Sequence, residues 1–284
     1  MSLKRTLSLI MMIVLCVSTL SLYSCRKELE DGFEVDGFVI RRDSIWNDET
    51  EQFEKIDSYL IREYNGTEKN VVLPDKAPNG YPIKAIVKWA FYKNLHIESI
   101  VIPDSYEEIL SNAFCELENL KSVYIGKGAR DISPWENFSV CWNLETIEVD
   151  PENPFYYSEG NCIIERETNS LLLASNHATI PDGVEWIQPC AFYGRESMKE
   201  IRIPKSVKII DEWAFFGCLS LKKVELYETV EKVNDLVFVN CPALTVYCEH
   251  SAQPEEWGEI WCKSSPEARN QYPFPDVIWG ADLE

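Results

Sequence analysis

One alternation of apolar and polar positions recurs along this chain, in the form Leu-x-x-Val-x-Ile followed by Pro, or a close variant of it. It reads IESIVIP at 97–103 and MKEIRIP at 198–204. A period of two places the apolar side chains on one face of a β-strand. Pro has no N–H to donate, so it ends the strand ladder. The pattern therefore predicts a series of short strands, each with one buried face.

An Ala-Phe pair or a variant of it follows each strand at a regular distance. Successive Phe residues are separated by 23, 24, 54, 23 and 23 positions, and they are Phe91, Phe114, Phe138, Phe192, Phe215 and Phe238. A fixed period in this range indicates supersecondary units that stack into a solenoid.

The Ala-Phe segments carry a helix signal. Asp211 and Glu212 precede Trp213, Ala214 and Phe215, and acidic residues favour the first turn of a helix. Each unit is therefore predicted to be one strand plus one short helix or 3₁₀ turn. The expected fold class is an α/β repeat, a curved solenoid of about six units of 23 residues with β-rich caps.

The period breaks at three places, which suggest the domain boundaries. Residues 37–74 are predicted to form an N-terminal β cap, residues 75–248 the solenoid and residues 249–284 a Trp-rich C-terminal cap, because terminal solenoid units are atypical and shield the apolar end. The 54-residue gap indicates an insertion at 150–179. Its two apolar runs, at 162–164 and 171–173, predict a β-hairpin.

The N-terminus has the order of a lipoprotein signal. Lys4 and Arg5 precede an apolar run at 7–17, which is too short to span a bilayer comfortably. Residues 22–25 (LYSC) resemble a bacterial lipobox, with Cys25 as the lipidated residue. We therefore expect a signal peptide at 1–24 and a tether at 25–36. An ordinary signal peptide that happens to contain Cys remains the alternative.

The sequence defines the cellular location of the lipidated protein less closely. Residues 26–31 (RKELED) loosely resemble the surface-export signal of Bacteroidetes lipoproteins, although a solvated tether has the same composition. The expected location is the outer membrane, lipid-anchored and exposed at the cell surface, with a periplasm-facing anchor as the alternative.

Charge and motifs exclude several functions. The formal charge of −20 argues against nucleic acid as a partner, since that binding depends on Lys and Arg. The three histidines, His96, His177 and His250, are not at metal-ligand spacing, and the chain has no GxSxG, GxGxxG or P-loop motif. We expect no metal, no cofactor and no enzymatic activity.

The cysteines have a structural explanation. Cys141, Cys218 and Cys241 each stand three residues after a repeat Phe, which predicts a ladder of buried thiols, because free Cys is among the most buried residue types. An exported protein can also hold disulfides. Cys248 and Cys262, both near the C-terminal cap, are the pair for which the sequence leaves a disulfide open.

The chain resembles the BspA-like leucine-rich-repeat family over about residues 58–280. The resemblance is carried by the 23-residue IP…I…AF…C..L..V unit, the DPENP insertion at 150–154 and the closing VIWG at 277–280. It implies a curved leucine-rich-repeat solenoid. Members are commonly surface or secreted proteins of host-associated bacteria, some of them implicated in adhesion. The family offers no catalytic residues to transfer.

These observations lead to a protein-binding or adhesion module whose partner is a host or bacterial surface protein. The alternative is an accessory glycan-binding lipoprotein of a nutrient-uptake system, which the aromatic-rich cap and loops would support. If the strands form a concave sheet, their variable positions point outward. The expected partner-binding residues are Tyr124, Glu148, Arg202 and Glu225, since aromatic and Arg side chains dominate binding hot spots. A merely solvated sheet face is the competing interpretation.

Overall fold

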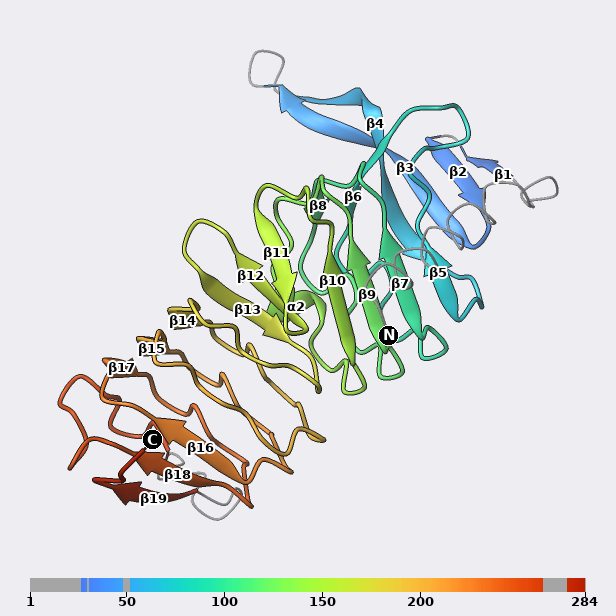
Figure 1. Cartoon of the computed structure of the whole chain (residues 1–284). Coiled ribbons are helices and arrows are strands. Elements are labelled where there is room, and N and C mark those ends of the chain that lie inside the picture. Colours follow the sequence, from blue (N-terminus) through green and yellow to red (C-terminus); the bar gives the residue numbers. More distant parts are fainter. Residues whose placement is uncertain (1–26, 30, 48–51, 263–274, 284) are drawn as a thin grey trace.

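The structure is a computed structural model, and it describes residues 27–29, 31–47, 52–262 and 275–283. The chain winds into an elongated solenoid that runs from an antiparallel sheet at the N-terminal end to strand β19 at the other end (Figure 1). A regular coil contains a main strand, a shorter second strand and a turn that carries the Ala-Phe pair or a variant of it. Strands of successive coils pair in parallel, so the predicted solenoid is confirmed.

The main strands form two separate parallel sheets. The first contains β5 (Asn70–Val72), β7 (Ser99–Ile102), β9 (Ser122–Ile125) and β10 (Thr146–Val149). The second contains β16 (Lys223–Leu226), β18 (Thr245–Cys248) and β19 (Asp276–Trp279). Their buried and half-buried residues alternate, as the period of two predicts.

The shorter strands line a second side of the solenoid. They are β6 (Ile83–Ile86), β8 (Glu108–Ile109), β14 (Trp186–Ile187), β15 (Ile209–Ile210) and β17 (Lys232–Val233). The sequence pattern did not separate them from the neighbouring loops. Four of the five contain two residues, which are too few to show a period.

The N-terminal end differs from its predicted boundaries. It consists of β1 (Lys27–Leu29), β2 (Gly32–Val35), β3 (Phe38–Asn47) and β4 (Gln52–Tyr64), which pair antiparallel in that order. Two of these strands lie in the segment 25–36 that was predicted to be a tether. That prediction is wrong for 27–29 and 32–35, because β2 pairs with β3 over Gly32–Val35.

The solenoid also begins before residue 75. The second part of β4 pairs in parallel with β6, and β5 pairs in parallel with β7. Tyr64, the last residue of β4, stacks on Phe91 with ring centroids 5.2 Å apart. The segment 37–74 therefore supplies the first coil of the solenoid as well as a cap.

The insertion at 150–179 is a meander of three antiparallel strands, β11 (Tyr156–Glu159), β12 (Cys162–Glu165) and β13 (Ser170–Ala174). The predicted hairpin corresponds to β12 and β13, and β11 was not predicted. Strand β13 then pairs in parallel with β14, so the insertion ends by rejoining the solenoid. Ile163 and Leu173 pack into the first of two buried clusters, whereas Ile164 and Leu171 pack into the second.

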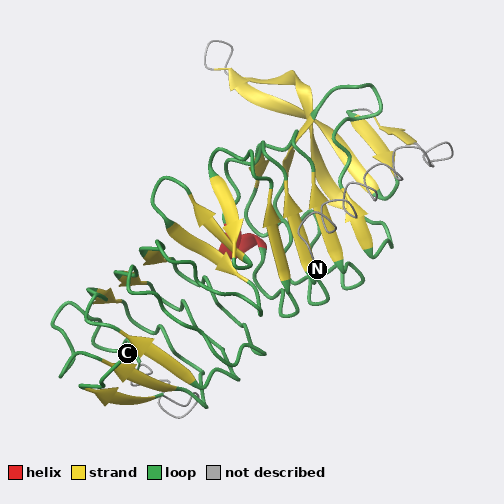
Figure 2. Cartoon of the chain, in the orientation of Figure 1, coloured by secondary structure: helices red, strands yellow, loops and turns green. Residues whose placement is uncertain are grey.

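The predicted short helices are wrong for the Ala-Phe segments. Among the described residues the helix is α2 (Pro134–Asn137), drawn in red in Figure 2, and the other Ala-Phe segments are turns. The residues two before and two after the Phe have left-handed backbones, as at Trp213 (φ 56°) and Gly217 (φ 72°) or at Leu236 (φ 61°) and Asn240 (φ 60°). A right-handed helix cannot pass through such residues.

Hydrogen bonds between coils explain why the Ala-Phe segments form turns rather than helices. The N–H of Phe192 donates to the carbonyl of Ala214 at 2.7 Å, and the N–H of Phe215 donates to the carbonyl of Val237 at 3.0 Å. A helix would direct these N–H groups within the segment and leave the next coil's carbonyls buried without donors, which is costly. The local acidic signal is too weak to outweigh that cost.

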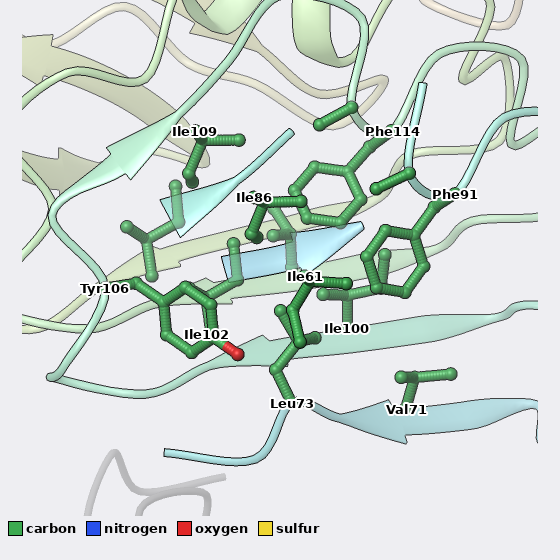
Figure 3. Close-up of a cluster of buried hydrophobic side chains, with 14 of the residues drawn as sticks. Ile61, Val71, Leu73, Ile86, Phe91, Ile100, Ile102, Tyr106, Ile109 and Phe114 are labelled. Atoms are coloured by element: carbon green, nitrogen blue, oxygen red, sulfur yellow. The ribbon is translucent and has the colours of Figure 1, made fainter. Parts of the chain in front are cut away.

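Apolar side chains from all three sides fill the interior. Figure 3 shows Ile61, Val71, Ile86, Ile100, Ile109 and the rings of Phe91 and Phe114 converging in the first cluster. The repeat Phe side chains stack from coil to coil, with centroids 5.0 Å apart for Phe91 and Phe114 and 4.7 Å for Phe192 and Phe215. Offset ring pairs at this spacing stabilise beyond their buried area.

We predict that Phe215→Ala strongly destabilises the protein, because Phe215 is fully buried between Phe192 and Phe238. Removing a buried Phe ring costs about 3–5 kcal/mol of unfolding free energy. Urea unfolding followed by circular dichroism measures the change. The matched control is Leu219→Ala in the same coil, where the side chain is exposed and a change within about 0.5 kcal/mol is expected. Equal effects of the two substitutions would contradict the stacked core.

Candidate functional site

The outward side chains of β5, β7, β9 and β10 form a flat surface that we call the strand face. The strand register aligns them in two rows. The first row is small and polar, and it consists of Asn70, Ser99, Ser122 and Thr146. The second row is mainly apolar, and it consists of Val72, Val101, Tyr124 and Glu148. All but the exposed Asn70 are half-buried. A row of Ser and Thr leaves the larger neighbouring row accessible.

Charged side chains border the strand face at the N-terminal ends of its strands. Glu98 lies between two lysines, with Lys69 Nζ 2.6 Å and Lys121 Nζ 2.8 Å from its carboxylate oxygens. The hydrogen bond from Lys121, then that from Lys69, lowers the pKa of Glu98 to about 2. Glu98 therefore stays ionised throughout the physiological range, and three coils are joined by charge along this edge.

A second charged border lies at the C-terminal ends of the same strands. Lys127 Nζ lies 3.3 Å from Glu152 and 3.8 Å from Asp104. The hydroxyl of Tyr124 donates to Asp150 Oδ2 at 2.7 Å. Burial, followed by the bond to Asp150, raises the pKa of Tyr124 well above its usual range. The Tyr124 ring is thus fixed in one orientation on the strand face.

The structure brings together two of the four sequence-predicted partner-binding residues. Tyr124 and Glu148 are direct neighbours on β9 and β10. Arg202 lies outside any strand and pairs with Asp182 at 3.3 Å. Glu225 lies in β16, where it pairs with Lys223 and faces Tyr247 on β18. Arg202 and Glu225 therefore do not belong to the strand face.

The expectation of one continuous sheet of main strands is wrong. β10 and β16 belong to different sheets, and residues 199–203 between them form no strand. The insertion causes the interruption, because β11 and β12 follow β10 where the next main strand would pair.

The cysteines of the described residues are buried, and none of these forms a disulfide. Cys218 Sγ donates to the carbonyl of Phe192 at 3.3 Å, and Cys241 Sγ donates to that of Phe215 at 3.1 Å. Burial raises the pKa of Cys141 to about 12. These contacts confirm the predicted thiol ladder. Cys248 and Cys262, for which a disulfide was left open, are not joined by one in the described structure.

Arg195 was missed by the sequence reasoning. It stands three residues after Phe192, at the position that holds Cys in three other copies of the repeat, and the residue is 2% exposed. Its Nε donates to the carbonyl of Ala174 at 2.6 Å and its Nη1 to that of Cys141 at 2.9 Å. A charged residue at a position that is uncharged in the other copies, and Cys in three of them, was the available signal in the sequence.

Within the described ranges, no group of three or more His, Cys, Asp or Glu side chains is placed to hold a metal ion. The part of the chain that the structure describes also holds no helix long and apolar enough to cross a membrane. Cys25, the expected lipidation site, lies outside the described residues.

The chain belongs to the family of the BspA type leucine rich repeat region. The family model matches in six copies over residues 51–161 and 164–251. This confirms the resemblance seen in the repeat unit. A search of curated proteins found no match.

Several solved structures share the solenoid. The pneumococcal vaccine antigen PcpA is 12% identical, with 82% of this chain and 77% of that chain covered and a TM-score of 0.51. The leucine rich repeat protein TpLRR of T. pallidum is 22% identical, covering 76% and 83%, with a TM-score of 0.42. A leucine-rich repeat protein of Bacteroides ovatus is 17% identical, covering 91% and 70%, also at 0.42. At these identities the likeness concerns the fold alone.

We predict a pH-dependent stabilisation by Glu98. A carboxyl group whose pKa falls from 4.5 to about 2 on folding stabilises the folded state above pH 4.5, and this contribution is lost as the pH falls toward 2. Glu98→Gln should therefore lower the urea midpoint at neutral pH, with a difference from wild type that shrinks below pH 4.5. The exposed Glu118 provides the control variant, Glu118→Gln. A difference that stays constant down to pH 3 would contradict stabilisation of the ionised Glu98 by Lys69 and Lys121.

Proposed function

We propose that this protein is a lipid-anchored, surface-displayed binding module, and that the strand face is the surface that docks a partner protein. The observation that carries the proposal is the layout of that face. An accessible row with Val72, Val101 and Tyr124 runs between two charged borders. Protein interfaces have the same plan, an apolar centre with aromatic anchors inside a polar rim.

The charged borders favour a protein partner with charges of both signs. Lys69, Lys121 and Lys127 stand beside Glu98, Glu152 and Asp104. Such an edge selects its partner by complementarity and orients it, while it contributes less to affinity than the centre does. A polyanion is disfavoured, because the acids at both borders already neutralise these lysines.

The strand face favours a protein over a glycan. Sugar rings bind by stacking on aromatic faces, and the two rows described above hold one aromatic ring, Tyr124. That ring is fixed by Asp150 among Ser, Thr and Val side chains. The Ser, Thr and Val side chains around Tyr124 can contact the side chains of a partner protein, but they offer no aromatic rings on which sugars could stack.

The lipid anchor at Cys25 belongs to the same proposal. A basic n-region, an apolar run and a lipobox-like LYSC at 22–25 support it. Strand β1 begins at Lys27, so one residue separates the anchor from the N-terminal sheet. On this arrangement the membrane lies next to the N-terminal sheet, and the coils that carry the strand face project from it. Two or more acyl chains make such attachment stable.

The anchor predicts a defined response to protease. Intact cells that express the protein should incorporate labelled palmitate into it, and added protease should degrade it. Cys25→Ser should abolish the label, and Arg26→Ser serves as the control that retains it. Label without protease sensitivity would place the anchored protein on the periplasmic side. Absence of label from the wild type would refute the lipid anchor.

The strand face predicts a localised loss of binding. Extracellular-matrix proteins and bacterial surface proteins are screened by surface plasmon resonance, with a glycan array run in parallel. We expect the double variant Val101→Asp and Tyr124→Ala to lower the affinity for a captured protein at least tenfold, as the loss of a hot-spot residue does. Both side chains are half-buried at the surface, and circular dichroism verifies folding.

The matched control is Tyr247→Ala. Tyr247 occupies the same register in TVYC of β18 that Tyr124 occupies in SVYI of β9, but it lies in the other sheet. Unchanged binding by the double variant, or an equal loss in Tyr247→Ala, would refute the strand face as the binding surface. Capture of glycans without any protein would favour the glycan-binding alternative.

A further inference from the structure

The stack of repeat Phe rings has a gap at the insertion. Rings follow one another from Tyr64 to Phe138 and again from Phe192 to Phe238. Between them stands Ala174, whose N–H donates to the carbonyl of Ala191 at 2.9 Å, just as the N–H of Phe192 donates to Ala214. Ala174 thus holds the position of a repeat Phe without supplying a ring.

A cavity of about 230 Å³ opens beside this gap, on the side of the solenoid that carries the Ala-Phe turns. Phe138 and Leu173 contribute apolar walls, and both are buried. Trp135 and Trp213 also line it, from coils on opposite sides of the gap, with 44% and 41% of their surfaces exposed. The missing ring leaves the space, and the partly exposed indoles together with Phe138 and Leu173 give the cavity an apolar and aromatic lining.

Arg195 also lines the cavity. Its guanidinium donates hydrogen bonds to two neutral backbone carbonyls, and none of the ion pairs among the described residues involves it. A buried guanidinium remains protonated, and burying a charge without a counter-ion is unfavourable. An anion that entered the cavity would supply the missing counter-charge, and a carboxylate suits the guanidinium geometry.

The rest of the lining restricts which anions fit. Burial, then the nearby Glu212 and Asp211, raises the pKa of Cys190 to about 11 on one wall, so acidic side chains lie close to that wall. They disfavour a bare anion, and the aromatic walls must add to the attraction. A volume below that of most drug-sized pockets limits the ligand to one or two rings.

From this geometry we infer a second binding site, for a small aromatic carboxylate whose ring packs against the indoles that line the cavity, Trp213 among them, and whose carboxylate pairs with Arg195. The site lies on the turn side of the solenoid, apart from the strand face, so the two proposals stand or fall independently.

Isothermal titration calorimetry with the purified protein tests the inference, with phenylacetate and indole-3-acetate as probes. The matched neutral probes are phenylacetamide and indole-3-acetamide, and acetate tests the charge without the ring. We expect at least one aromatic acid to bind saturably and its amide to bind about tenfold more weakly, because hydrogen bonds between charged groups are the stronger kind. Acetate should show no saturable binding.

Trp213→Ala should weaken binding of the aromatic acid about fivefold to tenfold through loss of one stacking partner. Trp89→Ala is the matched control, since Trp89 also stands two residues before a repeat Phe and is similarly exposed but does not line the cavity. Arg195→Gln removes the charge, and any loss of folding is detected by circular dichroism. Equal affinity for acid and amide, no binding of either acid, or an unaffected Trp213→Ala would overturn the inference.

Discussion

The structure depends on hydrogen bonding between equivalent backbone positions of successive coils. The N–H of Phe91 donates to Ala113 and that of Phe215 to Val237, one coil further along in each case. Side chains extend the same ladder, as when Cys241 donates to the carbonyl of Phe215. Because buried peptide groups need partners, every coil must repeat the geometry of its neighbour. That constraint fixes the 23-residue period and the left-handed residues of the turns.

Where the local sequence departs from the repeat, side chains keep the ladder complete. The coil with helix α2 has Asn137 at the position of the usual Ala. Its Oδ1 accepts from the N–H of Ala113 at 2.7 Å, and its Nδ2 donates to the carbonyls of Ile109 and Ile132. Arg195 acts similarly beside the insertion, where its length lets it reach carbonyls of both Cys141 and Ala174. Polar side chains thus supply the hydrogen-bond partners of backbone groups at irregular coils.

The two sides of the solenoid acquire different chemistry from this one scaffold. Main strands present flat rows with charged borders, since each second residue points outward and coils are in register. The turn side presents Trp89 and Trp213, which have left-handed backbones, and Trp135 of helix α2, and all three are exposed. The first surface suits a broad contact with a protein, and the second suits a small ligand at the one coil where a ring is missing.

The sequence by itself determined the solenoid, its core residues and the buried thiol ladder, because a fixed period and an alternating pattern are local properties. It also located the insertion. It predicted helices wrongly in the Ala-Phe segments, since acidic residues before Trp213 are a local signal and the ladder between coils is not. Likewise the pairing of β4 with β6, which moves the start of the solenoid, joins segments whose relation no local pattern shows.

The candidate sites divide in the same way. Tyr124 and Glu148 could be placed side by side from the repeat register alone, because both stand at one position of the unit. Arg202 and Glu225 share that position, yet the insertion separates them from the strand face. The lysines that pair with Glu98, and the carbonyl groups that accept from Arg195, belong to residues 21 to 54 positions away from Glu98 or Arg195 in the sequence. Only the stacking of coils decides such contacts, because it brings together groups that the chain itself keeps apart.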